Sequence, residues 1–257
     1  MQIVACQLDI TWEDKPASHK RAAELLAGHK IKPGALVVLP EMFATGFSMH
    51  VDTIAEATDG PTHQFLSELA EKLQSYVLAG VVTRASDGRG RNEAVTFGPD
   101  GQPVSRYCKL HPFSFAGEPN YYQAGESIEL FHWQEFQVAP LVCYDLRFPE
   151  TFRRATRQGA QVLVVIANWP LPREEHWLAL LKARAIENQA YVVGVNRAGA
   201  DPHVSYGGRS LILGPRGEVL AEAGNDPQVI SADITLEPLL EYRRQFPALA
   251  DMRAEFF

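Results

Sequence analysis

The chain has 257 residues, of which 46% are hydrophobic and 21% charged, and its formal net charge at pH 7 is −7. This composition is globular, and an acidic chain without a Lys/Arg block is not expected to bind nucleic acid. No apolar run approaches the roughly 20 residues that span a bilayer, and no secretion signal precedes the first strand-like segment. Because three cysteines without metal-type spacing suit a reducing compartment, we expect one cytoplasmic domain over residues 1–257.

The first half of the chain is predicted to alternate strands and helices. Apolar runs indicate the strands, apolar residues at helical spacing indicate the helices, and a Gly-Pro-Asp-Gly turn indicates a final hairpin. The expected elements are a strand at 2–9, a helix at 17–29, a strand at 35–40, a helix at 62–75, a strand at 76–83 and a hairpin of 92–98 with 104–109.

The second half repeats this order. Its expected elements are a strand at 138–143, a helix at 149–158, a strand at 161–167, a helix at 174–189, a strand at 190–196 and a hairpin of 208–213 with 218–222. We therefore predict two pseudo-symmetric β-α-β-α-β-β halves. The strands are apolar on both faces, but each half has helices for only one face of its sheet, so the two sheets should pack together. The predicted class is α/β, a four-layer α-β-β-α sandwich.

Cys143 ends the strand predicted at 138–143, and Pro149 fits the first turn of the next helix. A thiol that faces a helix N-terminus can have a lowered pKa, because backbone N–H dipoles favour the thiolate. This context makes Cys143 a candidate nucleophile. The alternative is a small buried strand residue without chemical function, which is the usual role of a cysteine.

Glu41 and Lys109 also end, or nearly end, predicted strands, and the repeat places them near Cys143. Glu41 follows the apolar run Leu36–Pro40, so its carboxylate should emerge from a buried edge. The alternatives are a solvated loop glutamate and a solvated lysine at a strand end. Together the three residues supply a nucleophile, a base that can later act as an acid, and a positive charge for the developing oxyanion, which hydrolysis of an amide requires.

Three segments resemble the catalytic motifs of the nitrilase superfamily of carbon–nitrogen hydrolases. They are Leu39-Pro-Glu-Met-Phe43, Tyr107-Cys-Lys-Leu-His111 and Leu141-Val-Cys-Tyr-Asp-Leu-Arg-Phe-Pro149, and the segments Asn168-Trp-Pro170 and Arg184-Ala-Ile-Glu-Asn-Gln-Ala-Tyr191 are also similar to this family. The resemblance covers essentially the whole chain. It implies an αββα fold, usually dimeric, without a metal or an organic cofactor.

The resemblance also implies roles for individual residues. Glu41 would be the general base, Lys109 the oxyanion stabiliser and Cys143 the nucleophile that forms a thioester. The backbone N–H of Tyr144 would complete the oxyanion hole, and Glu118 matches the position of a second glutamate that is often part of the site. For Glu118 the alternative is an ordinary loop glutamate.

Within the superfamily, the motifs are most similar to the bacterial omega-amidase branch. These enzymes hydrolyse the terminal amide of short 2-oxo dicarboxylic acid monoamides, such as 2-oxoglutaramate and 2-oxosuccinamate, to the dicarboxylate and ammonia. A small anionic amide needs a cation, and Arg147 is the candidate carboxylate anchor because a planar guanidinium suits bidentate binding. Bracing the start of the following helix is the alternative role for Arg147, and Arg173 is the alternative anchor. The residues expected to supply the pocket wall and polar orientation are Phe43, Phe113, Asn168 and Trp169.

Other functions stay open at this point. Another small amidase of the superfamily, acting on N-carbamoyl amino acids or deaminated glutathione, is the nearest alternative, and no feature of the sequence excludes nitrile hydrolysis. A cysteine–histidine hydrolase would pair His111 with Cys143, but it would leave Glu41 and Lys109 without a role. A non-catalytic scaffold is a further alternative. We expect Cys6 to be a core thiol, and Cys108 to point away from the face of Lys109 because side chains alternate along a strand.

The helix expected at 174–189 is apolar nearly all round, so it is a candidate for the interface of a homodimer. Within it, Glu187 is expected to be a structural hydrogen-bonding residue. The segment 235–257, which includes Phe256 and Phe257, has no counterpart in the first half, and we expect it to pack across that interface.

Overall fold

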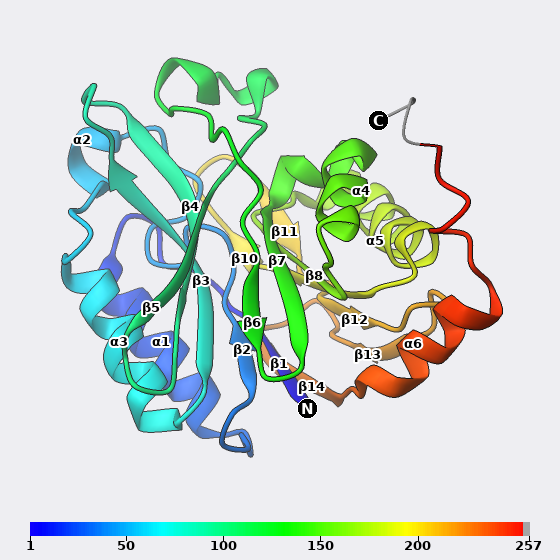
Figure 1. Cartoon of the computed structure of the whole chain (residues 1–257). Coiled ribbons are helices and arrows are strands. Elements are labelled where there is room, and N and C mark those ends of the chain that lie inside the picture. Colours follow the sequence, from blue (N-terminus) through cyan, green and yellow to red (C-terminus); the bar gives the residue numbers. More distant parts are fainter. Residues whose placement is uncertain (254–257) are drawn as a thin grey trace.

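The computed structural model describes residues 1–253, and its two six-stranded sheets pack face to face between two layers of helices (Figure 1). The predicted four-layer α-β-β-α sandwich is confirmed. Elements of the first half are β1 (Gln2–Gln7), α1 (Lys15–Ala27), β2 (Leu36–Val38), α2 (Val51–Ile54), α3 (Pro61–Leu73), β3 (Tyr76–Arg84), β4 (Gly90–Phe97), β5 (Pro103–Cys108) and the 3-10 helices η1 (Ser114–Ala116) and η2 (Glu118–Asn120).

The second half begins with β6 and ends with α6. Its elements are β6 (Phe131–Trp133), β7 (Phe136–Val142), η3 (Cys143–Arg147), α4 (Pro149–Arg157), β8 (Val162–Ala167), η4 (Leu171–Arg173), α5 (Glu174–Asn188), β9 (Tyr191–Asn196), β10 (Ala198–Ala200), β11 (Ser205–Gly207), β12 (Leu211–Leu213), β13 (Val219–Glu222), β14 (Gln228–Asp233) and α6 (Leu236–Gln245). No helix of residues 1–253 is both long and apolar enough to cross a membrane.

Alternation of side chains along β1 and β2 explains why the sheets form a sandwich. Ile3 and Val38 belong to a core cluster that also contains most of the second sheet, whereas Val4 and Val37 pack with α1 and α3 on the opposite face. All four side chains are fully buried. Because each buried Val, Leu or Ile side chain contributes about 1.5–3 kcal/mol, strands that are apolar on both faces are stable only with cover on both sides.

The two halves have the same topology, and each sheet contains the five strands expected from the ranges of its half, one more than the β-α-β-α-β-β pattern counts. Each sheet also has a further strand at its edge. The first sheet has the order β14-β1-β2-β3-β4-β5 and the second has the order β13-β12-β9-β8-β7-β6. In each sheet, three consecutive strands are parallel, and an antiparallel strand, β14 or β6, pairs with the first of them. The sequence analysis missed β6 and β14, because β6 has only three residues and β14 is half-exposed along its length.

The parallel strands position the candidate site. Glu41 follows β2, Cys143 follows β7 and Asn168 follows β8, so all three side chains lie at the carboxyl ends of parallel strands. Ligands of α/β sheets bind at this edge of the strands. The sandwich brings the edges of the two sheets together there.

The C-terminal helix α6 packs on its own chain. The Arg243 side chain donates hydrogen bonds to the carbonyl groups of Gln189 and Ala160, and Leu239 is fully buried. This part of the segment predicted to cross a subunit interface therefore contacts the second half of the same chain, while Phe256 and Phe257 lie outside the described residues.

Candidate active site

Lys109 lies at the centre of a buried cluster of charged side chains. It directly follows β5, and its ammonium nitrogen is 3.0 Å from Glu41 Oε1 and 2.9 Å from Glu118 Oε2. All three side chains are at most 1% exposed. An uncompensated buried charge is costly, so the ammonium needs carboxylate partners at this depth. The fold thus brings together three residues from separate segments of the chain.

Both carboxylate oxygens of Glu41 are held by hydrogen bonds. Asn92 Nδ2 donates to Glu41 Oε1 at 2.7 Å and to Glu118 Oε1 at 3.0 Å. The backbone N–H of Asn168 donates to Glu41 Oε2 at 2.8 Å. Gly80 makes room for this segment, because a Cβ at position 80 would lie 2.4 Å from the Glu41 Cα. The carboxylate is therefore fixed in one orientation.

Cys143 directly follows β7 and is the first residue of η3, where its backbone is strained. Its φ of 46° is in the left-handed region, which costs a non-glycine residue of order 1 kcal/mol or more and persists only where surrounding contacts impose it. The buried carboxylate of Asp145 supplies those contacts, accepting hydrogen bonds from the Tyr107 hydroxyl at 2.7 Å and from the backbone N–H groups of Val142 and His111 at 3.0 Å each. The turn directs the thiol toward the pocket.

Burial raises the pKa of the Cys143 thiol well above its ordinary value, and the negative charge of Glu41 raises it further. The Lys109 ammonium lowers this pKa without outweighing the other two effects. The prediction that a helix start lowers the thiol pKa is therefore wrong: α4 begins only at Pro149, and desolvation dominates at the sulfur. The thiol is neutral at pH 7 and hydrogen-bonded to Glu41, so it needs a base to become a nucleophile.

Glu41 is suited to be that base. Burial would raise the pKa of Glu41, but the Lys109 ammonium and the hydrogen bonds from Asn92 and Asn168 together hold it below its usual range. Burial would likewise lower the pKa of Lys109, but Glu118 and Glu41 keep it well above its ordinary value. The Lys109 ammonium and the Glu41 carboxylate therefore lie as a charged pair beside a neutral thiol.

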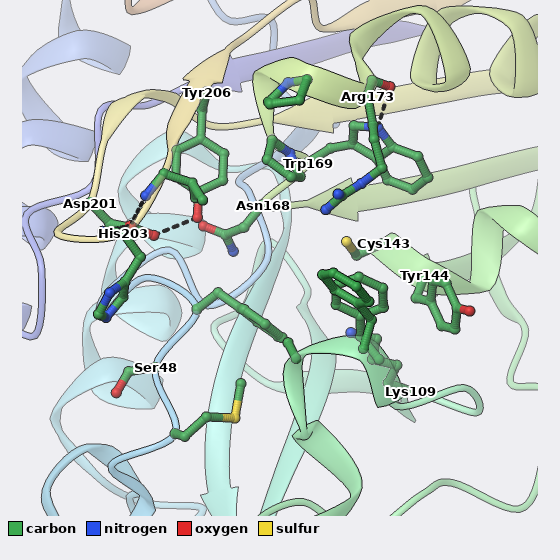
Figure 2. A pocket seen from close by; sticks show the side chains of 18 of the residues that line it. Ser48, Lys109, Cys143, Tyr144, Asn168, Trp169, Arg173, Asp201, His203 and Tyr206 are labelled. Carbon is green, nitrogen blue, oxygen red and sulfur yellow. Dashed lines mark hydrogen bonds between the residues drawn. The ribbon is translucent and has the colours of Figure 1, made fainter.

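The cluster opens into a pocket of about 450 Å³, within the range typical of small-molecule sites (Figure 2). In Figure 2, Asn168, Trp169 and Arg173 lie on one side of Cys143, and Lys109 lies on the other. The residues that line the pocket are Trp12, Phe47, Ser48, Met49, His50, Lys109, Phe113, Phe115, Ala116, Cys143, Tyr144, Arg147, Asn168, Trp169, Pro170, Pro172, Arg173, Asp201, His203, Val204 and Tyr206.

Comparison with known families decides the class of this site. The model of the carbon–nitrogen hydrolase family matches residues 2–244, which is nearly the whole chain. The chain belongs to the carbon–nitrogen hydrolase family. It is 35% identical over 256 residues to a 2-oxoglutaramate amidase of Bacillus subtilis, covering 99% of this chain and 98% of the relative. It is 37% identical over 253 residues to omega-amidase YafV of Escherichia coli K12, covering 98% and 96%.

Solved structures place the chain in the same family. The protein XC1258 of Xanthomonas campestris, a CN-hydrolase superfamily protein with an arsenic adduct in its active site, superposes with a TM-score of 0.91. It is 33% identical, and the alignment covers 99% of this chain and 97% of XC1258. Saccharomyces cerevisiae Nit3, of branch 10 of the nitrilase superfamily, superposes with a TM-score of 0.87 at 26% identity, covering 100% and 97%.

The expected pocket wall of this carbon–nitrogen hydrolase needs one correction. Phe113, Asn168, Trp169 and the two candidate anchors, Arg147 and Arg173, line the pocket, and so does Tyr144, whose backbone N–H is the expected oxyanion donor. Phe43 is instead fully buried in the core of the first half, with its ring 5.7 Å from His19 and 6.1 Å from Phe65. Phe47 lies at the pocket in its place, with its ring 5.2 Å from the Lys109 ammonium. The turn after β2 directs the later of the two phenylalanines toward the site.

Cys6, Cys108 and His111 of this hydrolase are not among the residues that line the pocket. Cys6 is fully buried under the helices of the first half, and burial raises its pKa to about 12. The Cys108 thiol contacts the carbonyl of Gln123 and does not join the Lys109 cluster. His111 Nδ1 is 2.8 Å from Asp145 Oδ1 and its ring stacks on Phe148 at 3.8 Å, so the described contacts give no support to a cysteine–histidine pair.

Sequence analysis missed two residues that hold the site together. Asn92 begins an apolar strand segment, and Asp145 lies two positions after the candidate nucleophile. Both are buried polar side chains in otherwise apolar surroundings. A polar residue at a position whose neighbours require burial is a weak signal of such a role. Glu187, in contrast, has the expected structural role, accepting a hydrogen bond from Arg184 at 2.9 Å.

Proposed function

We propose that this carbon–nitrogen hydrolase is an omega-amidase that converts short 2-oxo dicarboxylic acid monoamides, such as 2-oxoglutaramate and 2-oxosuccinamate, to the dicarboxylate and ammonia. The observation that carries the proposal is the convergence of Cys143, Glu41 and Lys109 at the base of a pocket that also contains Arg147 and Arg173. The B. subtilis and E. coli relatives named 2-oxoglutaramate amidase and omega-amidase support the substrate class.

In the first step, the Glu41 carboxylate removes the proton from the Cys143 thiol as the sulfur attacks the amide carbon. Glu41 serves as the base because its depressed pKa keeps it ionised at neutral pH. The carbonyl oxygen becomes an oxyanion, for which the Lys109 ammonium and the Tyr144 N–H are the proposed donors. The Tyr144 N–H belongs to the first turn of η3, where backbone donors lack partners within the helix.

In the second step, the protonated Glu41 gives its proton to the amide nitrogen, and ammonia leaves as the tetrahedral intermediate collapses to a thioester on Cys143. Glu41 then removes a proton from a water molecule that attacks the thioester carbon. The second intermediate expels the sulfur, which takes the proton back from Glu41. The product leaves as the carboxylic acid and loses its proton to ammonia or to solvent, which gives the carboxylate. Glu118 keeps Lys109 charged throughout, through its contact at 2.9 Å.

Arg147 is the proposed anchor for the substrate carboxylate. Its guanidinium lies 4.9 Å from the Trp169 ring and lines the same pocket as Cys143. A planar guanidinium that is held by an aromatic face can still bind a carboxylate through its N–H edges. Phe113 and Asn168 are proposed to close the wall around the acyl chain.

We further propose that the enzyme is a cytoplasmic homodimer of single-domain chains, and that it works without a metal or an organic cofactor. Helix α5 supports the interface, because Ile186 is 46% exposed while Trp177 and Leu181 on the same helix are fully buried against the sheet. Light scattering at two protein concentrations tests the assembly, and a monomer at both would contradict it.

The activity is tested by ammonia release from a panel of 2-oxoglutaramate, succinamate, an N-carbamoyl amino acid and deaminated glutathione. We expect the highest kcat/KM with the short dicarboxylic monoamides. The Cys143→Ala protein should show no turnover, while its melting temperature should equal that of the wild type. The highest kcat/KM with the carbamoyl compound or with deaminated glutathione would favour the neighbouring amidase classes. If no amide is turned over and no thiol reagent labels Cys143, the non-catalytic scaffold is the better description.

A further inference from the structure

Lys109 reaches the active site at the end of an edge strand. It directly follows β5, which is the last strand of the first sheet and pairs with β4 alone among the described strands (Figure 1). The backbone N–H of Lys109 donates to the carbonyl of Asn92 in β4 at 2.9 Å. An edge strand lacks the second ladder of hydrogen bonds that holds a central strand. Side-chain contacts between β5 and its surroundings therefore contribute to the position of Lys109.

The side chains of β4 alternate between the two faces of the sheet. Asn92 points into the catalytic cluster, where it donates hydrogen bonds to Glu41 and Glu118. Its neighbour Glu93 lies on the opposite face, together with Val95, which packs under the helices of the first half. The Glu93 carboxylate is thus directly behind the catalytic cluster, with the backbone of β4 between them.

Glu93 connects three strands at this point. Its Oε2 atom accepts hydrogen bonds from the Thr83 hydroxyl of β3 and from the Arg106 guanidinium of β5, each at 2.6 Å. The side chain of Glu93 is 2% exposed and that of Arg106 is 33% exposed. A buried carboxylate is costly unless it is paired, and hydrogen bonds between charged groups are stronger than those between neutral groups. The ion pair therefore favours one position of β5 along β4.

Helix α3 holds Arg106 from its other side. A second terminal nitrogen of Arg106 is 3.1 Å from His63 Nε2, and His63 is 3% exposed. Burial and the Arg106 charge lower the pKa of His63, so its imidazole is neutral at pH 7 and accepts this hydrogen bond. The resulting outer-face cluster consists of Thr83, Glu93, Arg106 and His63. The proposed mechanism uses none of its members.

We propose that Glu93 and Arg106 are positioning residues for Lys109, and that they act through β5 without touching the substrate. The inference rests on the proposed function, in which the Lys109 ammonium stabilises the oxyanion. Arg106 lies three residues before Lys109, and Cys108 is the ladder partner of Glu93. When the ion pair is lost, the end of β5 is free to shift and the ammonium moves away from the substrate carbonyl oxygen. Misplacement of a catalytic group by about 1 Å can lower the rate about 10²-fold.

Three variants separate the position of Lys109 from the stability of the fold. Glu93→Gln and Arg106→Met each break the ion pair and leave one charged partner, whereas Glu93→Gln/Arg106→Met removes both charges. We expect each single variant to lower kcat about tenfold, with KM changed less than about twofold, and to lower the melting temperature by about 2 °C or more. The double variant should recover most of the melting temperature, because no unpaired charge remains. Its kcat should stay low, because β5 is still not held.

Two controls accompany these variants. Arg106→Lys keeps the charge beside Glu93 but loses the contact with His63, and it should retain kcat within about threefold. Arg84→Met breaks an ion pair with Asp52 at the end of β3, in which the two side chains are 39% and 98% exposed, and it should leave kcat unchanged. Single variants with the kcat of the wild type overturn the inference. A double variant whose kcat returns together with its melting temperature overturns it as well.

A thiol reaction separates this inference from the proposed function. The Lys109 ammonium lowers the pKa of Cys143, so its displacement in Glu93→Gln should slow alkylation of Cys143 by iodoacetamide at pH 8 about threefold or more. In a Lys109→Met background, Glu93→Gln should change this rate less than about 1.5-fold, because the effect passes through Lys109.

If the wild type hydrolyses no amide, the proposed function fails, and the alkylation rates alone decide the inference. A slower reaction in Glu93→Gln that disappears in the Lys109→Met background supports it. Equal rates in the wild type and Glu93→Gln overturn it, and so does an equally large effect of Glu93→Gln in both backgrounds.

Discussion

Replacement of Lys109 by Met tests the charge balance on which the proposed chemistry depends. Met has a similar length and no charge, so the substitution removes the ammonium and leaves two buried carboxylates, Glu41 and Glu118, without a cation. Breaking a buried ion pair in this way costs about 3–5 kcal/mol. For a chain of this length, about 2 °C of melting temperature is lost per kcal/mol, so we expect a decrease of about 6–10 °C.

The pH dependence of stability should change sign in the variant. In the wild type, the pKa of Glu41 is depressed, so its contribution is present above the unfolded value of about 4.3 and is lost only as the pH falls through the folded pKa. The raised pKa of Lys109 makes a contribution that is present below about 10.5 and lost at higher pH. Without Lys109, burial raises the pKa of a carboxylate, so the Lys109→Met protein should become more stable as the pH falls from 7 toward 5.

Thermal unfolding at fixed protein concentration, at pH 5 and at pH 7, measures the decrease in melting temperature and its pH dependence. In steady-state assays, kcat/KM of the Lys109→Met protein should fall about 10²-fold or more, because an oxyanion donor is lost. Lys32→Met is the matched control: Lys32 forms an ion pair with Asp233 in which both side chains are more than half exposed, and its loss should cost less than about 1 kcal/mol. Adding Glu118→Gln to Lys109→Met restores the cluster charge and should recover part of the stability but not the activity. A Lys109→Met protein that melts within about 2 °C of the wild type would refute this reasoning. A melting temperature of this variant that falls between pH 7 and pH 5 would refute it as well.

Two further predictions concern the nucleophile and the pocket wall. Because burial and Glu41 raise the pKa of Cys143, its alkylation by iodoacetamide should accelerate steadily from pH 6 to pH 9 when followed by mass spectrometry; a plateau below pH 7 would indicate a lowered pKa instead. Phe47→Leu should raise KM for the proposed amides because Phe47 lines the pocket, whereas Phe43→Leu should cost about 1 kcal/mol of stability with KM unchanged. Steady-state kinetics and thermal melts compare the two variants, and equal effects on KM would contradict this assignment.

The sequence alone determined the fold class and predicted the position of the candidate site. Apolar strands such as 162–167 must be buried on both faces, so a sandwich with helices outside follows from composition and order. Proline at the first turn of α4 marked where that helix begins. Glu41, Lys109 and Cys143 stood out because a strand end places a polar side chain at the edge of an apolar core.

Only the tertiary structure decided how these groups act. The link from Asn92 to both glutamates, the choice of Phe47 over Phe43 at the pocket, and the raised pKa of Cys143 each depend on residues that are distant in sequence. Local patterns report which side of an element is apolar, but desolvation and charge at an atom depend on everything that packs around it. The sequence could place a thiol at the end of a strand, whereas its protonation state follows from the depth at which the two sheets bury it.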